Sequence, residues 1–296
     1  MKIFDCFMYF DEDLILDLRL NYLNKHVDYF VIVESKFNHN GEERKPLFDI
    51  NKFKDFKDKI IYLLVDTEGK NFYKTEKHDD KDKIAGKNLM NALIRENYQR
   101  NYIINGLDKA NDDDWIIISD LDEIPNLELN DLKKNENKIV FFNQLMIYYK
   151  LNLFLKDFPW IGSKACKKKY FKSPQWLRNV KDRKYPWWRL DILFSKTKYN
   201  NIKVFQNGGW HFSYIKKPRD IEKKLKSYLH HVEYEQNPIS IEKISELIKE
   251  KKTVYNLKVD SRSNKFSKGN SLEKLDMNLL PSYINKNLNK YLEWIE

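Results

Sequence analysis

The stretch DDDWIIISDLDEIP, residues 112–125, decides the fold. Its apolar run from Trp115 to Ile118 predicts a buried strand, and carboxylates follow where that strand ends. In an extended segment, residues i and i+2 face the same way, so Asp120 and Asp122 can converge on one cation. Two hard oxygen donors suit Mg²⁺ or Mn²⁺. The alternative is a strand-end turn whose acids only cap the segment that follows.

Strands and helices alternate on both sides of this stretch. Apolar runs predict strands, and helical spacing of apolar residues predicts helices. The strands are expected at 2–10, 28–35, 60–65 and 138–149, and the helices at 11–25 and 87–107. This alternation predicts an α/β fold with a mainly parallel sheet covered by helices on both faces. Ligands bind such sheets at the carboxyl ends of the strands, where Glu34, Asp120 and Asp122 fall.

The second half of the chain has a different pattern. Residues 150–215 are rich in aromatic side chains, with short strand candidates at 189–195, 202–206 and 210–215. Beyond Pro218 the pattern is helical, over 219–233, 239–252 and 282–295. We therefore expect an α/β domain followed by a C-terminal helical extension.

Composition excludes several classes of protein. The 296 residues are 42% hydrophobic and 33% charged, which is typical of a globular chain. No apolar run approaches the roughly 20 residues of a membrane-spanning helix, and the N-terminus lacks a signal-peptide pattern. Two cysteines make neither a disulfide scaffold nor a cysteine metal site. We expect a cytoplasmic protein without signal peptide or transmembrane helix.

The net charge of +10 is concentrated in one segment. Residues 163–189 hold ten basic residues and one acid, interleaved with aromatic side chains. This pattern predicts an anionic partner, such as a phosphorylated or lipid-linked molecule or an anionic membrane surface touched peripherally. It also leaves open a nucleic-acid or polyanion-binding protein, or simply a solvated lysine-rich loop. A nucleic-acid surface leaves the carboxylates of 120–123 unexplained, so we expect no nucleic-acid partner.

Several blocks together resemble one known family. SDLDEIP (119–125), RENYQRNYI (95–103), GGWHFSY (208–214) and the segment 4–35 are similar to glycosyltransferase family 17. The resemblance implies a GT-A type fold and a metal-dependent, inverting transfer of a sugar from a UDP-sugar donor. The family's known activity, a bisecting β-1,4-N-acetylglucosaminyltransferase, implies UDP-GlcNAc as the donor and a β-linkage to a glycan hydroxyl. A phosphatase with a D-x-D nucleophile is a weaker alternative, because that pair belongs near the first strand.

The resemblance also implies an organisation. We expect a glycosyltransferase domain over residues 1–235, with a nucleotide-sugar half at about 1–125 and an acceptor half at about 126–235. Residues 236–296 would be the helical extension. Members of the family from animals carry an N-terminal anchor and stem, which this sequence lacks. A glycan or lipid-linked acceptor outside the Golgi setting is therefore expected, and the oligomeric state stays open.

Site residues follow from position within these blocks. The resemblance places a metal on Asp120 and Asp122, with His211 as a further ligand, although a histidine between Trp210 and Phe212 can equally be a core residue. Donor-binding residues are expected at the end of the second strand (Glu34 and Ser35), on the helix before the D-x-D (Arg100) and at the metal (Asp120). The alternative for Arg100 is a surface salt bridge with Glu96.

An inverting transfer needs a general base that the metal does not consume. Asp191 is the first candidate, and Glu123 and Glu233 remain open. Asp191 follows Trp187 and Trp188, whose aromatic faces suit the binding of an acceptor sugar ring. The alternative for Asp191 is a simple ion pair with Arg189 or Arg183.

Overall fold

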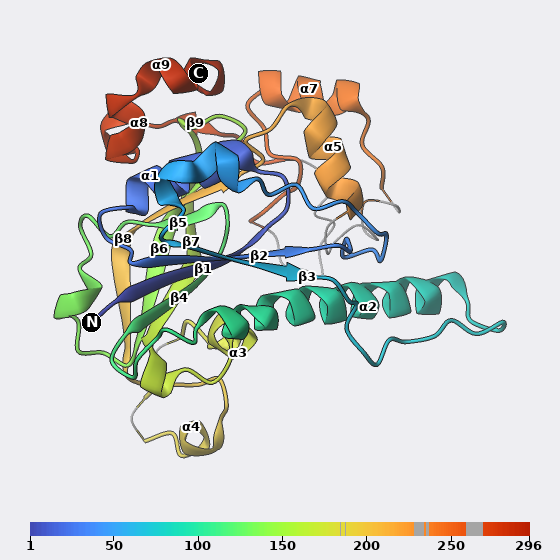
Figure 1. Ribbon diagram of the computed structural model, residues 1–296. Helices are drawn as coiled ribbons and strands as arrows, with labels where there is room; N and C mark the ends of the chain where they lie inside the picture. The colour runs from blue at the N-terminus through green and yellow to red at the C-terminus, as the bar shows by residue number, and fades with distance from the viewer. Residues whose placement is uncertain (184, 187, 228–233, 235–236, 259–268) are drawn as a thin grey trace.

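The computed structural model describes residues 1–183, 185–186, 188–227, 234, 237–258 and 269–296. Within them the strands form one mixed sheet in the order β3-β2-β1-β4-β7-β6-β8-β5, with β9 paired to β7. The strands are β1 (Ile3–Tyr9), β2 (Tyr29–Ser35), β3 (Ile60–Val65), β4 (Trp115–Asp120), β5 (Glu123–Pro125), β6 (Ile139–Tyr148), β7 (Leu153–Lys167), β8 (Ile202–Ser213) and β9 (Glu273–Lys274). Helices lie above and below this sheet (Figure 1).

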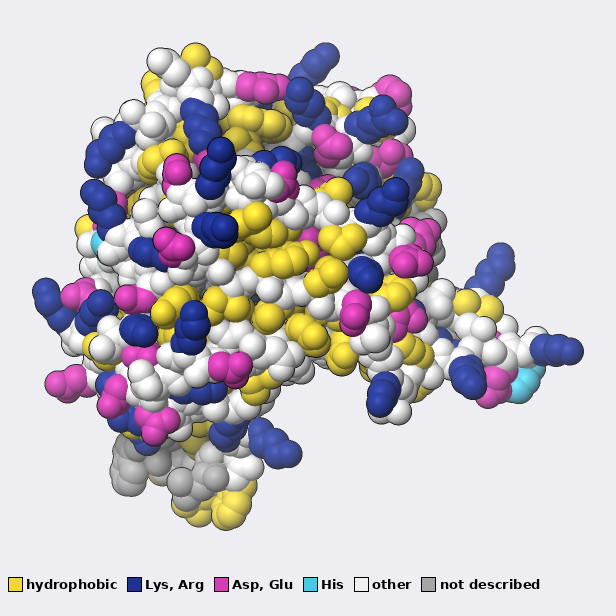
Figure 2. Space-filling model, viewed as in Figure 1, with side chains coloured by type: hydrophobic (Ala, Val, Ile, Leu, Met, Phe, Trp, Pro, Cys, Tyr) yellow, Lys and Arg dark blue, Asp and Glu magenta, His cyan; other side chains and the backbone are white. Residues whose placement is uncertain are grey.

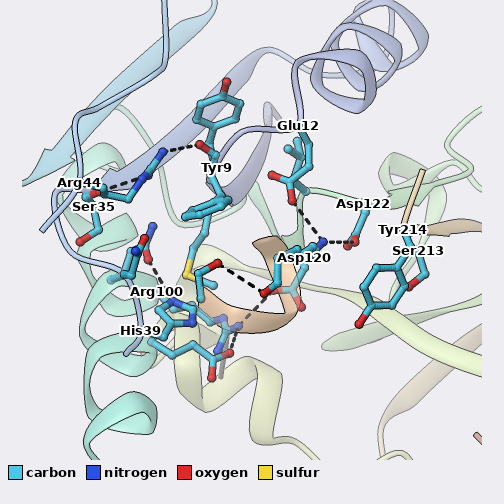
Figure 3. Close-up of a pocket in the computed structure, with 18 of the residues that line it drawn as sticks. Tyr9, Glu12, Ser35, His39, Arg44, Arg100, Asp120, Asp122, Ser213 and Tyr214 are labelled. Atoms are coloured by element: carbon cyan, nitrogen blue, oxygen red, sulfur yellow. Dashed lines mark hydrogen bonds and ion pairs between the residues drawn. The ribbon is translucent and has the colours of Figure 1, made fainter. Parts of the chain in front are cut away.

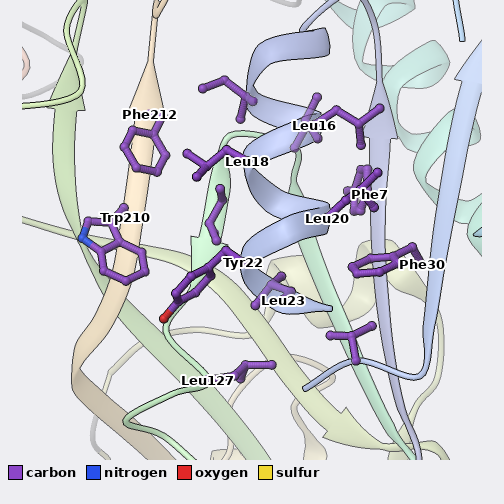
Figure 4. Packing of buried hydrophobic residues seen from close by; sticks show 14 of the residues in the cluster. Phe7, Leu16, Leu18, Leu20, Tyr22, Leu23, Phe30, Leu127, Trp210 and Phe212 are labelled. Carbon is purple, nitrogen blue, oxygen red and sulfur yellow. The ribbon is translucent and has the colours of Figure 1, made fainter. Parts of the chain in front are cut away.

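The four strands of the first half are parallel, as expected. Helix α1 (Asp13–Leu23) covers one face, where it packs between β8 and the β1–β2 pair (Figure 4). The long α2 (Lys81–Asn101) and a 3₁₀ turn, η2 (Tyr102–Gly106), lie on the other face. Successive side chains of a strand point to opposite faces, so Phe7 contacts the α1 layer and Cys6 the η2 layer. Both faces are buried, which explains the continuous apolar runs.

The prediction of a mainly parallel sheet was wrong for the second half. The 15-residue strand β7 runs antiparallel to both β4 and β6, and β8 runs antiparallel to β5. No strand was predicted at β7, because Pro159, Gly162 and charged residues at 156–157 interrupt its apolar pattern. The sheet is therefore mixed.

Two further expectations needed correction in this region. The strand expected at 189–195 is instead a short helix, α4 (Asp191–Phe194). A run of four apolar residues around one acid fits either structure, and no neighbouring strand pairs with this segment in the described residues. The two strands expected at 202–206 and 210–215 are one continuous strand, β8. Gly209 lies inside it with a positive φ of 130°, which marks a local irregularity.

The segment after β8 is mainly helical where it is described, but the short strand β9 and irregular stretches interrupt its helices. Helices α5 (Pro218–Ser227) and α7 (Ile241–Lys249) pack together through Ile221, Leu225 and Ile244. Helices α8 (Ser282–Lys286) and α9 (Leu288–Tyr291) join the core cluster of α1. The remaining elements are α3 (Pro174–Asn179) and the 3₁₀ turns η1 (Ile50–Phe56), η3 (Leu132–Lys134), η4 (Lys168–Tyr170), η5 (Met277–Leu279) and η6 (Leu292–Trp294). In the part of the chain described here, none of the helices is both long and apolar enough to cross a membrane.

Candidate active site

A cavity of about 430 Å³ opens where β1, β2 and β4 reach their carboxyl ends. This is the position at which open α/β sheets bind ligands, and the volume is in the range of small-molecule pockets. Figure 3 shows polar side chains from several elements converging on it. The charged residues that line it are Glu12, Arg44, Glu96, Arg100, Asp120, Asp122, Arg178, His211 and Lys224.

The D-x-D turn is held from behind by Arg19, which lies on α1. The Arg19 guanidinium donates to both carboxylate oxygens of Asp5, at 2.7 and 2.6 Å, and both side chains are fully buried. Its Nη1 donates to the backbone carbonyls of Asp120, Leu121 and Glu123 at 3.1, 3.0 and 2.7 Å. Arg19 was not predicted as a site residue. The signal was a lone arginine in the apolar helix LILDLRL, opposite a lone aspartate in the first strand.

The Asp120 carboxylate lies between two guanidinium groups. Oδ1 is 3.1 Å from Arg100 Nη2, and Oδ2 is 3.1 Å from Arg178 Nη2. Burial alone would raise the pKa of Asp120, but the charges of Arg178 and Arg100 outweigh it and hold the pKa below its usual value. Arg100 comes from the end of α2, as expected, whereas Arg178 comes from α3 and was not predicted as a site residue. The side chain of Asp120 keeps 38% exposure toward the cavity.

Asp122 faces a different pair of cations. Its Oδ1 is 3.5 Å from His211 Nε2, and its Oδ2 is 3.4 Å from Lys224 Nζ on α5. Burial disfavours its charged form, yet Lys224 and His211 lower the pKa of Asp122 well below the ordinary value. Burial likewise disfavours a charged His211, but the Asp122 carboxylate raises the pKa of that imidazole overall. Residues 121–122 form a turn beyond β4, so Asp120 and Asp122 reach the cavity with different partners.

The donor set of Asp120, Asp122 and His211 suits a divalent cation only in part. Two carboxylates and an imidazole are ligands that Mn²⁺ and Mg²⁺ accept, and Asp122 and His211 already face one another. Asp120 is engaged by two arginines. In the described residues, the three-residue group whose ligand atoms all lie within 4.8 Å is the peripheral Glu76, His78 and Asp79 instead. An ion in the cavity would be held by Asp122 and His211, with Asp120 beside them.

Glu123, a predicted base candidate, lies in the framework beneath the turn. Its side chain is fully buried and does not line the cavity. Oε1 accepts from Trp160 Nε1 at 2.9 Å, while Oε2 accepts from the Asp120 backbone N–H at 2.9 Å and from Arg178 Nη1 at 2.6 Å. These bonds use both oxygens, so the structure places Glu123 as the support for Asp120 and Arg178.

The two residues predicted at the end of β2 have different roles in the structure. Glu34 is fully buried, and its carboxylate accepts from the backbone N–H groups of Leu47 and Phe48 and from the Tyr62 hydroxyl. It therefore anchors the following loop and does not line the cavity. Ser35 does line it.

Two residues of that loop were not predicted. Asn38 and His39 both line the cavity, and the Asn38 Oδ1 and His39 Nδ1 atoms are buried there without a hydrogen-bond partner. The sequence signal that could have indicated Asn38 and His39 is their position as polar residues shortly after a strand of this sheet.

The other predicted residues fall elsewhere. Asp191 lies on α4, outside the cavity lining, and pairs with Arg189 at 2.7 Å and Lys198 at 2.6 Å. The alternative of an ion pair with Arg189 is thus what the structure contains. Trp188 is 65% exposed near the same helix. Trp187 and Glu233 lie outside the described residues.

Comparison with known proteins identifies the family of the chain. The profile of glycosyltransferase family 17 matches residues 1–294. The match includes the C-terminal helices as well as the motif blocks at 95–103, 119–125 and 208–214. No curated protein gives a significant match. Since the family profile covers nearly the whole chain, the chain belongs to glycosyltransferase family 17.

Proposed function

We propose that this glycosyltransferase is a metal-dependent, inverting enzyme of GT-A type that transfers a sugar from a UDP-sugar, UDP-GlcNAc by family resemblance, to a glycan hydroxyl. The observation that carries the proposal is the cavity itself. It lies at the carboxyl ends of parallel strands and places two carboxylates among Arg100, Arg178, His211 and Lys224. Cationic groups at this position suit a diphosphate, and the carboxylates suit the divalent ion that accompanies it.

The leaving diphosphate would lie against the arginines and the metal. Arg178 and Arg100 are held in place by Asp120, and Arg100 also by Gln175 and Glu96. Guanidinium groups fixed by such contacts need little reorganisation when negative charge develops. Mn²⁺ or Mg²⁺ on Asp122 and His211 would supply further stabilisation of that charge.

The nucleobase would occupy the opposite wall, beside Ser35, Asn38 and His39. Asn38 Oδ1 is a buried acceptor that lacks a donor, and leaving it unpaired is costly. Once the side chain turns toward the cavity, the imide N–H of uracil would satisfy it, and the amide N–H of the same side chain would complement the neighbouring uracil carbonyl. This complementarity supports a uridine nucleotide.

The general base is best sought among the carboxylates of the cavity wall. Besides the D-x-D pair, these are Glu12 and Glu96, and Glu96 is bound by Arg100 at 2.6 Å. Glu12 lies across from Asp122 and shares Lys224 with it, at 3.2 Å. We assign the base role to Glu12 ahead of the predicted Asp191, while Glu233 stays a prediction.

The alternative of a nucleic-acid or polyanion surface over 163–189 has less support. Two of its basic residues, Lys164 and Arg178, point inward and bond to protein groups. The segment 163–189 therefore offers a polyanion fewer free cations than its sequence suggests.

Thermal unfolding with UDP, GDP, CMP or TDP, each with Mn²⁺ or with EDTA, tests the proposal. A ligand at about 100 times its dissociation constant stabilises the folded state by about 2.7 kcal/mol. We expect a rise in Tm for UDP with metal, its loss in Asp122→Asn and its retention in Asp191→Asn. An equal UDP shift in EDTA would refute the role of the metal. No shift with any nucleotide, in folded protein, would refute the donor site.

A further inference from the structure

A small lobe projects from the molecule away from the cavity. We define the α4 lobe as residues 180–199, with α4 near its tip (Figure 1). Its base is closed by a hydrogen bond from the Lys181 N–H to the Thr197 carbonyl at 2.9 Å. Trp176 Nε1 donates to the Lys196 carbonyl at 2.7 Å and fastens the base to α3. The lobe is thus anchored between α3 and β8, the elements that carry Arg178 and His211.

The tip of the α4 lobe exposes large apolar side chains. Phe194 is 88% exposed, the highest value among the large hydrophobic residues that the structure describes, and Leu190 is 72% exposed. They are four residues apart across one helical turn, so they lie on the same side. Figure 2 shows hydrophobic side chains at the lower tip of the molecule. Exposed apolar groups gathered in this way mark an interaction surface.

The lobe is also strongly basic. Residues 180–199 contain six basic residues and two acids, a net charge of +4. Arg189 and Lys198 are balanced by Asp191, whereas Lys181 and Arg183 are exposed near the base. An apolar tip that projects beyond a basic rim complements a surface with negative charge outside and hydrocarbon beneath it. A nucleic acid would complement the charge but would offer Leu190 no apolar environment.

We propose that the α4 lobe is a peripheral membrane anchor. Leu190 and Phe194 enter the boundary between headgroups and acyl chains of an anionic bilayer, and Lys181, Arg183 and Lys196 bind anionic headgroups. Because α3 and β8 link the lobe to the cavity, this docking would hold the active site beside acceptors that reside in the membrane. The proposal does not depend on the identity of the nucleotide donor.

Co-sedimentation of the full chain with vesicles tests the lobe. The vesicles are phosphatidylcholine alone or phosphatidylcholine with about a third phosphatidylglycerol. We expect binding to the anionic vesicles, weakened in about 1 M salt, where charges are screened beyond about 3 Å. The double variant L190E/F194E should bind at least tenfold more weakly. K181E/R183E should lose roughly fivefold for each cation removed.

Leu129→Glu is the matched control, since Leu129 is 70% exposed but lies outside the lobe, and it should bind vesicles as the wild type does. A UDP-induced rise in Tm that survives in L190E/F194E shows that the variant is folded and separates this test from that of the donor site. Wild-type protein that ignores anionic vesicles, or a double variant that still binds them, would overturn the proposal. The proposal would also be overturned if the double variant lost binding to single-stranded DNA, or lost self-association, in place of vesicle binding.

Discussion

Replacing Arg19 by Met is the sharpest test of how the D-x-D turn is held. Arg19 makes hydrogen bonds to both oxygens of Asp5, to Ser119 Oγ and to the carbonyls of residues 120, 121 and 123. Methionine fills much of the same volume but supplies neither the charge nor the donors. The change leaves a buried, unpaired Asp5 carboxylate and backbone acceptors without partners.

The expected cost follows from these two losses. Breaking a buried ion pair by removing one partner costs about 3–5 kcal/mol. Backbone carbonyls that lose a buried donor add about 1–3 kcal/mol each at most, and less where water from the cavity can reach them. A total of about 5 kcal/mol or more is a large part of the roughly 5–15 kcal/mol that stabilises a folded domain. Asp5→Leu added to Arg19→Met removes the orphaned charge and should restore about 3 kcal/mol.

Urea unfolding followed by far-UV circular dichroism measures the four members of this cycle. We expect Arg19→Met to be the least stable and the double variant to recover part of the loss. In the folded double variant, the metal-dependent rise in Tm with UDP should be smaller, because the turn has lost its three carbonyl contacts. A single variant within about 1 kcal/mol of the wild type, or strictly additive effects in the cycle, would refute the reasoning.

Three further predictions concern burial, backbone geometry and catalysis. Burial and the neighbouring charge of Arg178 lower the pKa of Lys164 from 10.5 to about 8. Between pH 8 and pH 10.5 the unfolded chain therefore binds more protons than the folded one, and the free energy of unfolding should rise with pH over this range by about 2–3 kcal/mol. Lys164→Met should abolish this rise. Gly209→Ala should lower Tm markedly, because φ is 130° and the new Cβ would lie 2.1 Å from the Ile124 carbonyl oxygen. Gly86→Ala, in helix α2 with open space around the new Cβ, should instead stabilise the fold by about 0.5–1 kcal/mol. In sugar-transfer assays Glu12→Gln should lower kcat by about 10² or more while Asp191→Asn stays within about twofold, and the reverse order would exclude Glu12 as the base.

The first half of the fold was predictable because its information is local. Strands β1 to β4 are short apolar runs, of which β1, β2 and β4 are buried on both faces and the edge strand β3 is half-buried, and the polar residues that follow them lie at one edge of the sheet. Helix α2 begins six residues earlier than the expected 87, at Lys81, where Asp80 caps it by accepting from the Lys83 N–H. That capping aspartate was visible in the sequence, but it lies in a charged segment without the regular spacing of apolar residues that predicts a helix.

The partners of the site residues were not predictable in the same way. Asp120 meets Arg178 across 58 positions of sequence, and Asp122 meets Lys224 across 102. Nothing in the neighbourhood of Arg178 distinguishes it from the other basic residues of 163–189. Strand β7 sets Arg178 apart from the other basic residues. Its antiparallel pairing with β4 brings the chain back so that α3, which carries Arg178, lies beside the D-x-D turn.

This return of the chain gives the basic segment two separate uses. Lys164 donates to the carbonyls of residues 178 and 180 at 2.6 and 2.7 Å, which fixes the end of α3 where Arg178 begins its contact with Asp120 and Glu123. Those two cations are consumed inside the protein. Lys181 and Arg183, which follow Val180, are exposed in the lobe instead, where exposed Leu190 and Phe194 accompany them. The stretch that looked like one anion-binding segment thus serves two purposes: Lys164 and Arg178 are internal counter-charges at the candidate site, and Lys181 and Arg183 belong to an external surface.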